Sequence, residues 1–448
     1  MILLVLFNFM RIFDNDFWGD EAYSIALIRM PFKDMIAETA ADVNPPLYYI
    51  LLRLVVFIFG YHGWAFHLAS FIPYLVVMIF VSVSVRKRFG IDSAFVFMTL
   101  ASVASTSYYY NIEVRTYSLA AAFVLFAYYY LLVVMEGKMK DCILFVVFSL
   151  GAAYCHYYAL FAVSLFYLVL IVGAFSRRIE ASRVILICTL TLAGYMPWLF
   201  HMFSAFRRTS EGFWMDSIPG VKSALSYFYQ SEYGVFSIAM LGFTCITVLY
   251  SVYRHRDADS YWALWGIITS FGVMAAGYLI SYLIIPSFTE RYMYPVIPVL
   301  WLSFGVCISR LKHTHIITAV VILLILIVYI PEDIRTCIKD YRRNALCRET
   351  DERLHELIGE DDVILTDNDH LAWTILEYYL PGIENEYTEE LSGYGNYQDS
   401  KHYWAVWSAE LPEEEIEGLS EIGIIPEEKI ADGEIGLSPV FLYDLKRE

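Results

Sequence analysis

The chain has 448 residues, of which 58% are hydrophobic, and a mean hydropathy of +0.52. Soluble domains contain roughly 45–50% apolar residues, so this excess excludes an ordinary soluble protein. The net charge of −17 is divided unevenly: residues 332–448 contain 10 Lys and Arg against 30 Asp and Glu, whereas residues 1–331 contain 21 against 18. The sequence therefore indicates a nearly neutral membrane body with an acidic soluble tail, and nothing basic enough to bind nucleic acid.

Apolar runs of about twenty residues can cross the ~30 Å hydrocarbon core only as helices. The first run is short and lacks the cleavage site of a signal peptide, so we interpret it as a span that is truncated or continues upstream. Eleven runs are predicted to be transmembrane helices: 1–13, 66–85, 93–110, 116–135, 142–158, 159–175, 184–203, 234–253, 261–285, 292–309 and 315–331.

Residues 45–60 are also apolar, but they are only sixteen long and contain Arg53. Interpreting them as an amphipathic helix at the membrane interface places twelve basic residues in five short loops on one side, which is the charge pattern of cytoplasmic loops. The N-terminus is then predicted inside and the acidic tail outside. The twelve residues are Arg86, Lys87, Arg88, Lys138, Lys140, Arg177, Arg178, Arg183, Arg254, Arg256, Arg310 and Lys312.

This topology gathers ionisable residues from six separate chain positions at the outer face, and such a convergence predicts a functional site. Each residue type also has a simpler interpretation. The acidic pair after the first span could be a general base or merely cap a helix, and each arginine could clamp a lipid phosphate or snorkel to the surface. The six positions are Asp20/Glu21, Asp42, Glu113/Arg115, His156, the loop 204–233 and Glu290/Arg291.

The tail alternates short strand-like and helix-like segments, which predicts a small α/β domain of ~110 residues. Asp367-Asn368-Asp369 resembles a metal-binding D-x-D motif, but its place between a strand and a helix favours N-capping. Cys337 and Cys347 would lie ~15 Å apart on one helix, too far for a disulfide. The expected elements are strands at 363–366, near 403–406 and at 439–443, and helices at 370–380 and 412–422.

Taken in order, these signals resemble the bacterial members of glycosyltransferase family 39, within the C-type glycosyltransferase superfamily. Relatives include the dolichyl-phosphate-mannose protein mannosyltransferases and the lipid A aminoarabinose transferases. The resemblance extends over about 300 residues, and its motifs agree in order and spacing. These motifs are Trp18-Gly19-Asp20-Glu21-Ala22-Tyr23, Asp42-Val43-Asn44-Pro45-Pro46-Leu47-Tyr48-Tyr49, Glu113-Val114-Arg115-Thr116-Tyr117-Ser118-Leu119, His156-Tyr157-Tyr158, Pro197-Trp198 and Arg291-Tyr292 with two prolines after it.

The resemblance implies a plasma-membrane enzyme that moves a sugar from a polyprenyl-phosphate donor to an extracytoplasmic protein, lipid or cell-wall glycan, with inversion at the anomeric carbon. Asp20 would be the catalytic base, supported by Glu21. Asp42 would line the acceptor or sugar side, and Arg115 and Arg291 would hold the carrier phosphate, which becomes the leaving group. Asn44, His156 and Glu290 would also bind substrate. The interfacial helix would line the groove for the lipid. Arginines on the leaving phosphate need no metal, so we expect no cofactor.

The charge division, the topology and the pattern of the tail together predict two domains, a membrane domain at 1–331, whose first outer loop is 14–64, and an extracytoplasmic α/β domain at 332–448. Two positions depart from the family pattern. Asn44 stands where the family usually has His, and His67 stands where an Arg is expected after the interfacial helix. Asn44 can donate a hydrogen bond but cannot carry charge, so it is not expected to make the phosphate contact of a charged His. With His67 in place of the Arg, the contact to the donor headgroup is expected to differ.

Two other functions fit parts of the pattern. A flippase for a lipid-linked glycan would use the same arginines, but transporters usually show internal repeats and ionisable groups at mid-membrane. A non-catalytic scaffold that displays the acidic tail would make Asp20, Arg115 and Arg291 dispensable. The sequence favours the transferase over both.

Overall fold

The computed structural model describes residues 1–448 except 15, 43, 138, 212–216, 285, 369–374, 399 and 448. The chain forms two compact units. The first comprises Met1–Ile12 and Phe32–Ile334, and the second comprises Phe13–Pro31 and Arg335–Glu448. The predicted domains, 1–331 and 332–448, differ from these units chiefly in the segment Phe13–Pro31, which groups with the C-terminal part of the chain.

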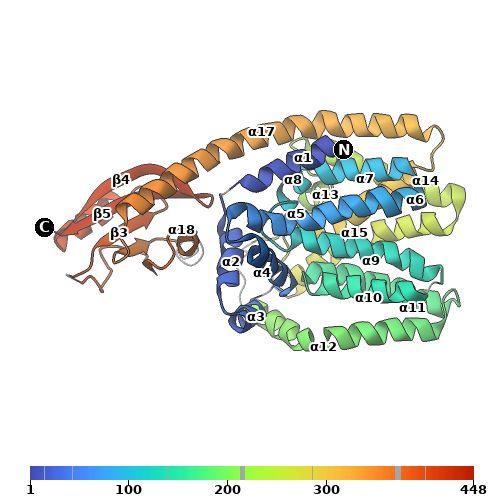
Figure 1. Cartoon of the computed structure of the whole chain (residues 1–448), viewed down its shortest axis with the longest axis horizontal. Coiled ribbons are helices and arrows are strands. Elements are labelled where there is room, and N and C mark those ends of the chain that lie inside the picture. Colours follow the sequence, from blue (N-terminus) through green and yellow to red (C-terminus); the bar gives the residue numbers. More distant parts are fainter. Residues whose placement is uncertain are drawn as a thin grey trace. The chain divides into compact units, whose positions relative to one another are not determined.

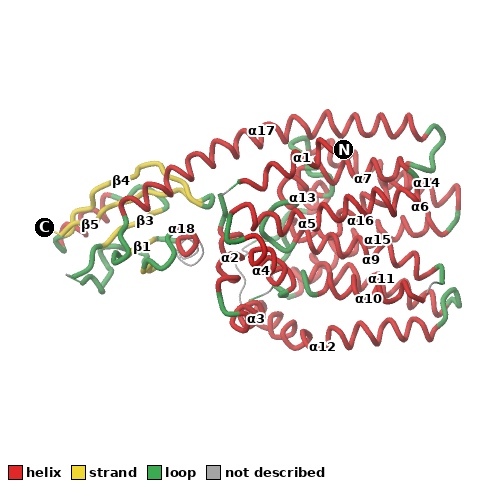
Figure 2. The backbone as a smooth tube through the Cα atoms, in the orientation of Figure 1, coloured by secondary structure: helices red, strands yellow, loops and turns green. Residues whose placement is uncertain are grey.

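Among the described residues of the first unit, every regular element is a helix (Figures 1 and 2). The last of them, α17 (Thr314–Leu357), begins in this unit and continues into the second. The others, in chain order, are α1 (Ile2–Met10), the 3₁₀ helix η1 (Arg11–Phe13), whose last residue belongs to the second unit, α3 (Phe32–Ala41), α4 (Leu47–Phe59), α5 (Gly63–Phe80), the π-helix η2 (Val81–Val85), α6 (Arg86–Phe89), α7 (Ile91–Val103), α8 (Ser105–Tyr110), α9 (Tyr117–Met135), α10 (Met139–Ala153), α11 (Tyr157–Phe175), α12 (Ala181–Glu211), α13 (Val221–Tyr227), α14 (Gly234–His255), α15 (Ala258–Leu283), the 3₁₀ helix η3 (Glu290–Val296) and α16 (Ile297–Ile308).

Among the described residues, eight helices are long and apolar enough to cross a membrane. They correspond to eight of the eleven predicted spans. The other three predicted spans coincide with shorter apolar helices, Ile2–Phe13, Ile91–Val103 and Asp141–Ala153. The predicted interfacial segment is α4, whose 13 residues rise only ~20 Å, less than the hydrocarbon thickness. The prediction of a helical polytopic membrane protein is confirmed.

The predicted span 93–110 is broken at Ala104, whose extended backbone (φ −61°, ψ 140°) separates α7 from α8. The last carbonyls of a helix have no partner further along it. Here two buried asparagines supply the donors. Asn111 Nδ2 donates to the Ala101 carbonyl at 3.0 Å, and Asn8 Nδ2 of α1 donates to the Ser102 carbonyl at 2.9 Å. The break is therefore satisfied by side chains inside the bundle.

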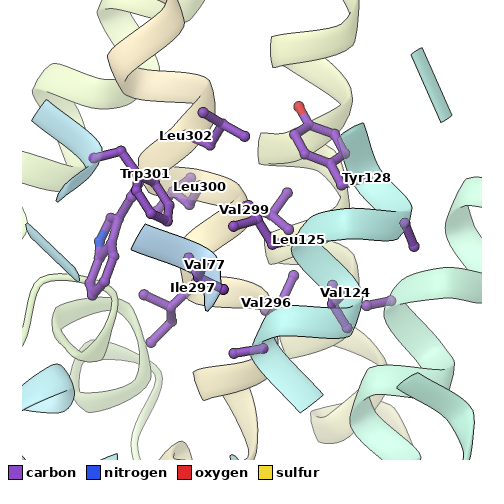
Figure 3. Close-up of a cluster of buried hydrophobic side chains, with 14 of the residues drawn as sticks. Val77, Val124, Leu125, Tyr128, Val296, Ile297, Val299, Leu300, Trp301 and Leu302 are labelled. Atoms are coloured by element: carbon purple, nitrogen blue, oxygen red, sulfur yellow. The ribbon is translucent and has the colours of Figure 1, made fainter. Parts of the chain in front are cut away.

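The core of the first unit is packed around α16, every residue of which is buried. Figure 3 shows its side chains facing those of α9, including Tyr128. The Tyr128 hydroxyl donates to the Trp262 carbonyl at 2.6 Å and bonds to Ser303 Oγ at 2.9 Å. A Cβ added to Gly305 would lie 2.8 Å from the Ser93 carbonyl oxygen, so α7 and α16 approach as closely as glycine permits.

One end of the bundle is tied together by ion pairs between loops. Arg88, which precedes α7, lies 2.5 Å from Glu136 after α9 and 2.9 Å from Asp259 in the first turn of α15. Arg310, after α16, lies 3.3 Å from the same Asp259. Four of the five loops predicted to be cytoplasmic therefore contribute to one cluster at one end, in agreement with the alternation of helix directions that the charge pattern predicts.

The second unit contains α2 (Gly19–Arg29), the part of α17 from Arg335 onwards and a five-stranded sheet of order β2-β1-β3-β5-β4. Strand β1 pairs in parallel with β2 and β3, whereas β5 is antiparallel to both β3 and β4. The remaining elements are β1 (Val363–Thr366), α18 (Glu377–Tyr379), β2 (Glu384–Tyr387), β3 (Tyr403–Trp407), α19 (Glu413–Glu421), β4 (Ile424–Ile435) and β5 (Ser438–Arg447).

Side chains alternate along the central strands and bury both faces of the sheet. On β3, Trp404 and Val406 pack with α17 residues such as Leu354, whereas Tyr403 and Ala405 face the cluster that contains Leu419 of α19. Both sides are covered, which explains why β1 and β3 are continuous apolar runs rather than alternating ones.

Most predicted elements of the tail are present as β1, β3, α19 and β5, but β2 and β4 were not predicted. The prediction of a helix at 370–380 falls partly outside the described residues, as does Asp369 of the D-x-D motif. Asp367 accepts from the Ser408 amide at 3.0 Å and the Ser408 hydroxyl at 2.5 Å, which joins the ends of β1 and β3. The start of the helix that it was predicted to cap lies outside the described residues. All seven cysteines are free.

Candidate active site

The end of the bundle away from the ion-pair cluster carries the second concentration of charge. Arg115 lies two residues before the start of α9 at Tyr117, and Glu136 of the ion-pair cluster directly follows this helix. A helix of 19 residues rises ~28 Å. Arg115 is therefore separated from that cluster by about the thickness of the hydrocarbon core, as predicted for residues on the two faces of a membrane.

The connection that carries Arg115 is held to α4 and α5 by hydrogen bonds. Ser70 of α5 donates to the Glu113 carbonyl at 2.5 Å and bonds to the Tyr48 hydroxyl of α4 at 2.7 Å. His67 Nδ1 lies 2.9 Å from the Ile112 carbonyl. His67, which occupies the position of the expected family arginine, is thus buried against the backbone of this connection.

His156 lies in the connection between α10 and α11, where its Nδ1 accepts a hydrogen bond from the Tyr158 amide at 3.1 Å and caps α11. Burial, and then the charges of Arg115 and Arg291, lower the pKa of His156 from 6.5 to about 3. The ring is therefore neutral. Because Nδ1 is an acceptor, the proton of the neutral ring is assigned to Nε2, which leaves Nε2–H as a donor.

Aromatic rings surround His156. The ring of Tyr117, from the first turn of α9, has its centroid 5.7 Å away, and the ring of Tyr292 in η3 has its centroid 5.2 Å away. Arg291 is adjacent to Tyr292 in η3, and its guanidinium lies 5.8 Å from the centroid of that ring. Three chain regions, 115–117, 156 and 291–292, therefore meet around one imidazole.

Glu290 begins η3, and its Oε1 accepts a hydrogen bond from the Ser223 hydroxyl of α13 at 2.6 Å. Tyr227, one turn along α13, bonds to the Tyr110 hydroxyl at 2.5 Å and lies within electrostatic reach of Glu113 and Glu290. These contacts place the described part of the loop 204–233 against η3. Glu290 therefore has a clear structural role in orienting the segment that carries Arg291.

The start of α4 lies against the residues before His156. The Leu47 amide donates to the Tyr154 carbonyl at 3.1 Å, two residues before His156. Upstream, Asn44 Nδ2 donates to Asp42 Oδ2 at 2.8 Å. The two residues are paired with each other, and the Asn44 amide supplies a hydrogen bond where the family has an imidazole. Val43, between them, lies outside the described residues.

Asp20 and Glu21 lie in the second unit, in the first turn of α2. Glu21 is buried, with 5% of its surface exposed, whereas Asp20 is half-buried. Trp18 is the N-cap, and its carbonyl accepts from the amides of Glu21 and Ala22. Both acids lie at the positive end of the α2 dipole, as the capping interpretation expects.

The structure thus brings Arg115, His156, Glu290 and Arg291 together through their neighbours at one end of the first unit. The sequence had no signal for Ser223, and it identified Tyr117 and Tyr292 only as parts of motifs. Among the described residues, no group of three or more His, Cys, Asp or Glu is arranged to hold a metal ion. Two arginines beside a neutral imidazole are instead suited to bind a phosphate, through guanidinium forks and one N–H donor.

Comparison with known proteins agrees with this arrangement. Residues 43–201, which include α4, Arg115 and His156, match the family model described as dolichyl-phosphate-mannose-protein mannosyltransferase. This match confirms the resemblance to the dolichyl-phosphate-mannose protein mannosyltransferases that the sequence predicts, over residues 43–201. Among curated protein sequences, none matches this chain at a significant level.

Two similar solved structures are crystal structures of ArnT from Cupriavidus metallidurans. The structure in the apo state has a TM-score of 0.64 at 13% identity, and the structure bound to undecaprenyl phosphate has a TM-score of 0.62 at 12% identity. In both, the match covers 99% of this chain and 96% of the ArnT chain.

Proposed function

We propose that the protein is an integral-membrane glycosyltransferase that moves a hexosyl or pentosyl group from a polyprenyl-phosphate donor to an acceptor outside the cytoplasm, with inversion at the anomeric carbon. The observation that carries this proposal is the convergence of Arg115 and Arg291 on a neutral His156. It lies within a chain that matches a mannosyltransferase family model over residues 43–201 and shares its fold with a protein crystallised with undecaprenyl phosphate.

In the proposed reaction, Asp20 accepts the proton of the acceptor hydroxyl while the oxygen attacks the anomeric carbon from the face opposite the phosphate. The bond between the anomeric carbon and the phosphate oxygen breaks, and its electron pair leaves with the polyprenyl phosphate. The departing group gains one negative charge, which Arg115 and Arg291 stabilise and the His156 Nε2–H hydrogen-bonds. Glu21 supports the base, and Asp42 and Asn44 contact the sugar or the acceptor.

Charge stabilisation by two guanidinium groups supplies what a metal ion would otherwise contribute, so we propose a metal-independent reaction. The exposed residues of α4, which include Ile50, Leu54 and Phe57, would line the groove for the polyprenyl chain. The charge pattern of the loops supports a location of the site and of the domain at 332–448 on the extracytoplasmic side of the plasma membrane. The acceptor would be a protein, a lipid or a cell-wall glycan.

The test is sugar transfer by the purified full-length protein in detergent, with a panel of radiolabelled polyprenyl-phosphate sugars and with nucleotide sugars as negative controls. We expect transfer by the wild type only from the carrier-linked donors. Asp20→Asn should lower the rate by about 10²–10⁴-fold. Arg115→Met should lower the rate by about 10²–10³-fold, and it should also weaken binding of undecaprenyl phosphate.

Two exposed residues provide matched controls. Asp34→Asn changes an acid in the first turn of α3, and Arg254→Met changes an arginine at the opposite end of the bundle. Both variants should retain the wild-type rate. Full activity of the Asp20→Asn variant would show that Asp20 is not the catalytic base. If the wild type and all variants bind the carrier without sugar transfer, and the protein moves the carrier across a bilayer, the proposed function would change from a transferase to a flippase.

A further inference from the structure

The segment Phe13–Pro31, which contains Asp20, is part of the C-terminal unit although it lies near the start of the chain. A membrane enzyme can carry its base on a loop, but a loop positions a catalytic group only when packing and hydrogen bonds restrain it. The contacts of this segment identify the residues that restrain it.

Asp16 is held by an arginine of α17. Arg343 Nε lies 2.6 Å from Asp16 Oδ2, and only 1% of the Asp16 side chain is exposed. The same guanidinium lies 3.3 Å from Asp340 and 3.9 Å from Glu434 of β4. A buried carboxylate requires such a partner, and removal of one partner of a buried pair leaves an uncompensated charge.

Phe17 is held by a tyrosine of α18. The Tyr379 hydroxyl accepts from the Phe17 amide at 3.1 Å, and the fully buried Phe17 ring packs edge-on against Tyr378 at 5.2 Å between centroids. The backbone is also in contact: a Cβ added to Gly436, in the turn between β4 and β5, would lie 2.7 Å from the Phe17 carbonyl oxygen. Ring, amide and carbonyl of one residue are therefore all fixed by the C-terminal unit.

These anchors lie next to the start of α2. Only Trp18, the N-cap of α2, and Gly19 separate Phe17 from Asp20. A helix that begins at Gly19 has its first turn oriented by the residues immediately before it. Restraint of Asp16 and Phe17 therefore fixes the direction in which the first turn presents Asp20.

We infer that the C-terminal unit acts as a clamp that positions the general base, with Arg343 and Tyr379 as positioning residues for Asp20. The inference rests on the proposed role of Asp20 as the base. It gives the acidic tail a function in catalysis that requires no contact between the tail and the substrate.

The experiment compares Arg343→Met with Arg342→Met, the same substitution at the adjacent exposed residue of α17, in the full-length protein. The first readout is amide hydrogen exchange, followed by mass spectrometry on peptides that cover residues 13–31. Arg343→Met should raise exchange in this segment by about tenfold or more and leave β3 and β5 unchanged. Arg342→Met should match the wild type.

The second readout is turnover with a polyprenyl-phosphate sugar that supports transfer by the wild type. Misplacement of a base by ~1 Å can cost about 10²-fold, so kcat of Arg343→Met should fall by about 10–100-fold while KM for the donor stays within about twofold. Arg343→Lys should recover part of kcat. The double variant Asp16→Asn/Arg343→Met should have the same kcat as Arg343→Met alone, or a higher one, because both substitutions remove the same ion pair.

Unchanged exchange in residues 13–31, or an unchanged kcat, would overturn the inference. Increased exchange throughout the sheet, with kcat and the affinity for the donor reduced together, would also overturn it. If Arg343→Met does not fold, Tyr379→Phe takes its place, with smaller changes in the same direction. If the wild type transfers from no donor, the proposed function fails, while the exchange data still decide whether the clamp holds the segment.

Discussion

The neutrality of His156 leads to a prediction about stability and pH. Its pKa in the folded protein is lowered to about 3, whereas the value in an unfolded chain is 6.5. When the folded-state pKa of a histidine is lowered, protons bind to the unfolded state first, so stability is present above the unfolded value and is lost as pH falls below it. The affected window runs from about pH 6.5 down to about pH 3.

The magnitude follows from linkage. One pKa unit corresponds to about 1.4 kcal/mol, so lowering the pH from 7 to 5 should destabilise the wild type through this one residue by about 2 kcal/mol. The matched variant is His156→Asn, because asparagine retains an N-cap acceptor for the Tyr158 amide but does not titrate. Other carboxylates and histidines titrate equally in both proteins and cancel in the comparison.

The assay is thermal unfolding of both proteins in the same detergent at a series of pH values. Between about pH 7 and pH 5, the melting temperature of the wild type should fall more than that of His156→Asn, by on the order of a few °C. Parallel curves for the two proteins would refute the reasoning. They would mean that His156 is protonated as easily in the fold as in the unfolded chain and that the two arginines do not act on it.

Three further predictions concern packing, buried polar groups and metal. Gly305→Ala should destabilise the protein by about 1–3 kcal/mol, because the new methyl group would meet the Ser93 carbonyl at 2.8 Å. The control is Gly242→Ala, which has open space around it and should raise the melting temperature slightly. Equal shifts of the melting temperature in the two variants would contradict the close approach of α7 and α16. Tyr128→Phe should cost about 1–3 kcal/mol in thermal unfolding, since it removes two buried hydrogen bonds, to the Trp262 carbonyl and to the Ser303 hydroxyl. An unchanged melting temperature would count against these hydrogen bonds. Treatment with a chelator should leave sugar transfer within about twofold of the untreated rate, because guanidinium groups stabilise the leaving phosphate; a loss reversed only by added divalent metal would disprove metal independence.

The membrane helices could be predicted from the sequence because hydrocarbon leaves few alternatives to a helix for a long apolar run. What hydropathy does not detect is the break at Ala104, since the run 93–110 contains neither Pro nor Gly. That break depends on asparagines at positions 8 and 111, outside the run itself. In the tail, β4 was missed because its exposed residues, such as Glu427 and Glu428, resemble a loop, whereas the strand is formed by pairing with β5.

The site could be predicted only as separate motifs. Residues such as Arg115 and His156 are marked by being ionisable near the ends of apolar runs, which is a signal that one sequence contains. Their approach to Tyr292 depends on how α9, α11 and η3 pack, and a single sequence does not contain that information. The assignment of Phe13–Pro31 to the C-terminal unit was missed for the same reason, because Asp16 gives no indication that its partner is an arginine 327 residues further along.

The asparagine-satisfied break between α7 and α8 couples the assembly of the bundle to its first helix. A carbonyl exposed to hydrocarbon costs several kcal/mol, so the broken conformation is favourable only when a donor is in place. Asn8 provides that donor for Ser102, and it does so only when α1 is docked. Without that donor, the Ser102 carbonyl would lose its side-chain partner, which disfavours the broken conformation of residues 91–110. The bent form that leads into Arg115 therefore becomes stable together with the docking of α1, so a correctly formed site reports that the N-terminal helix has joined the bundle.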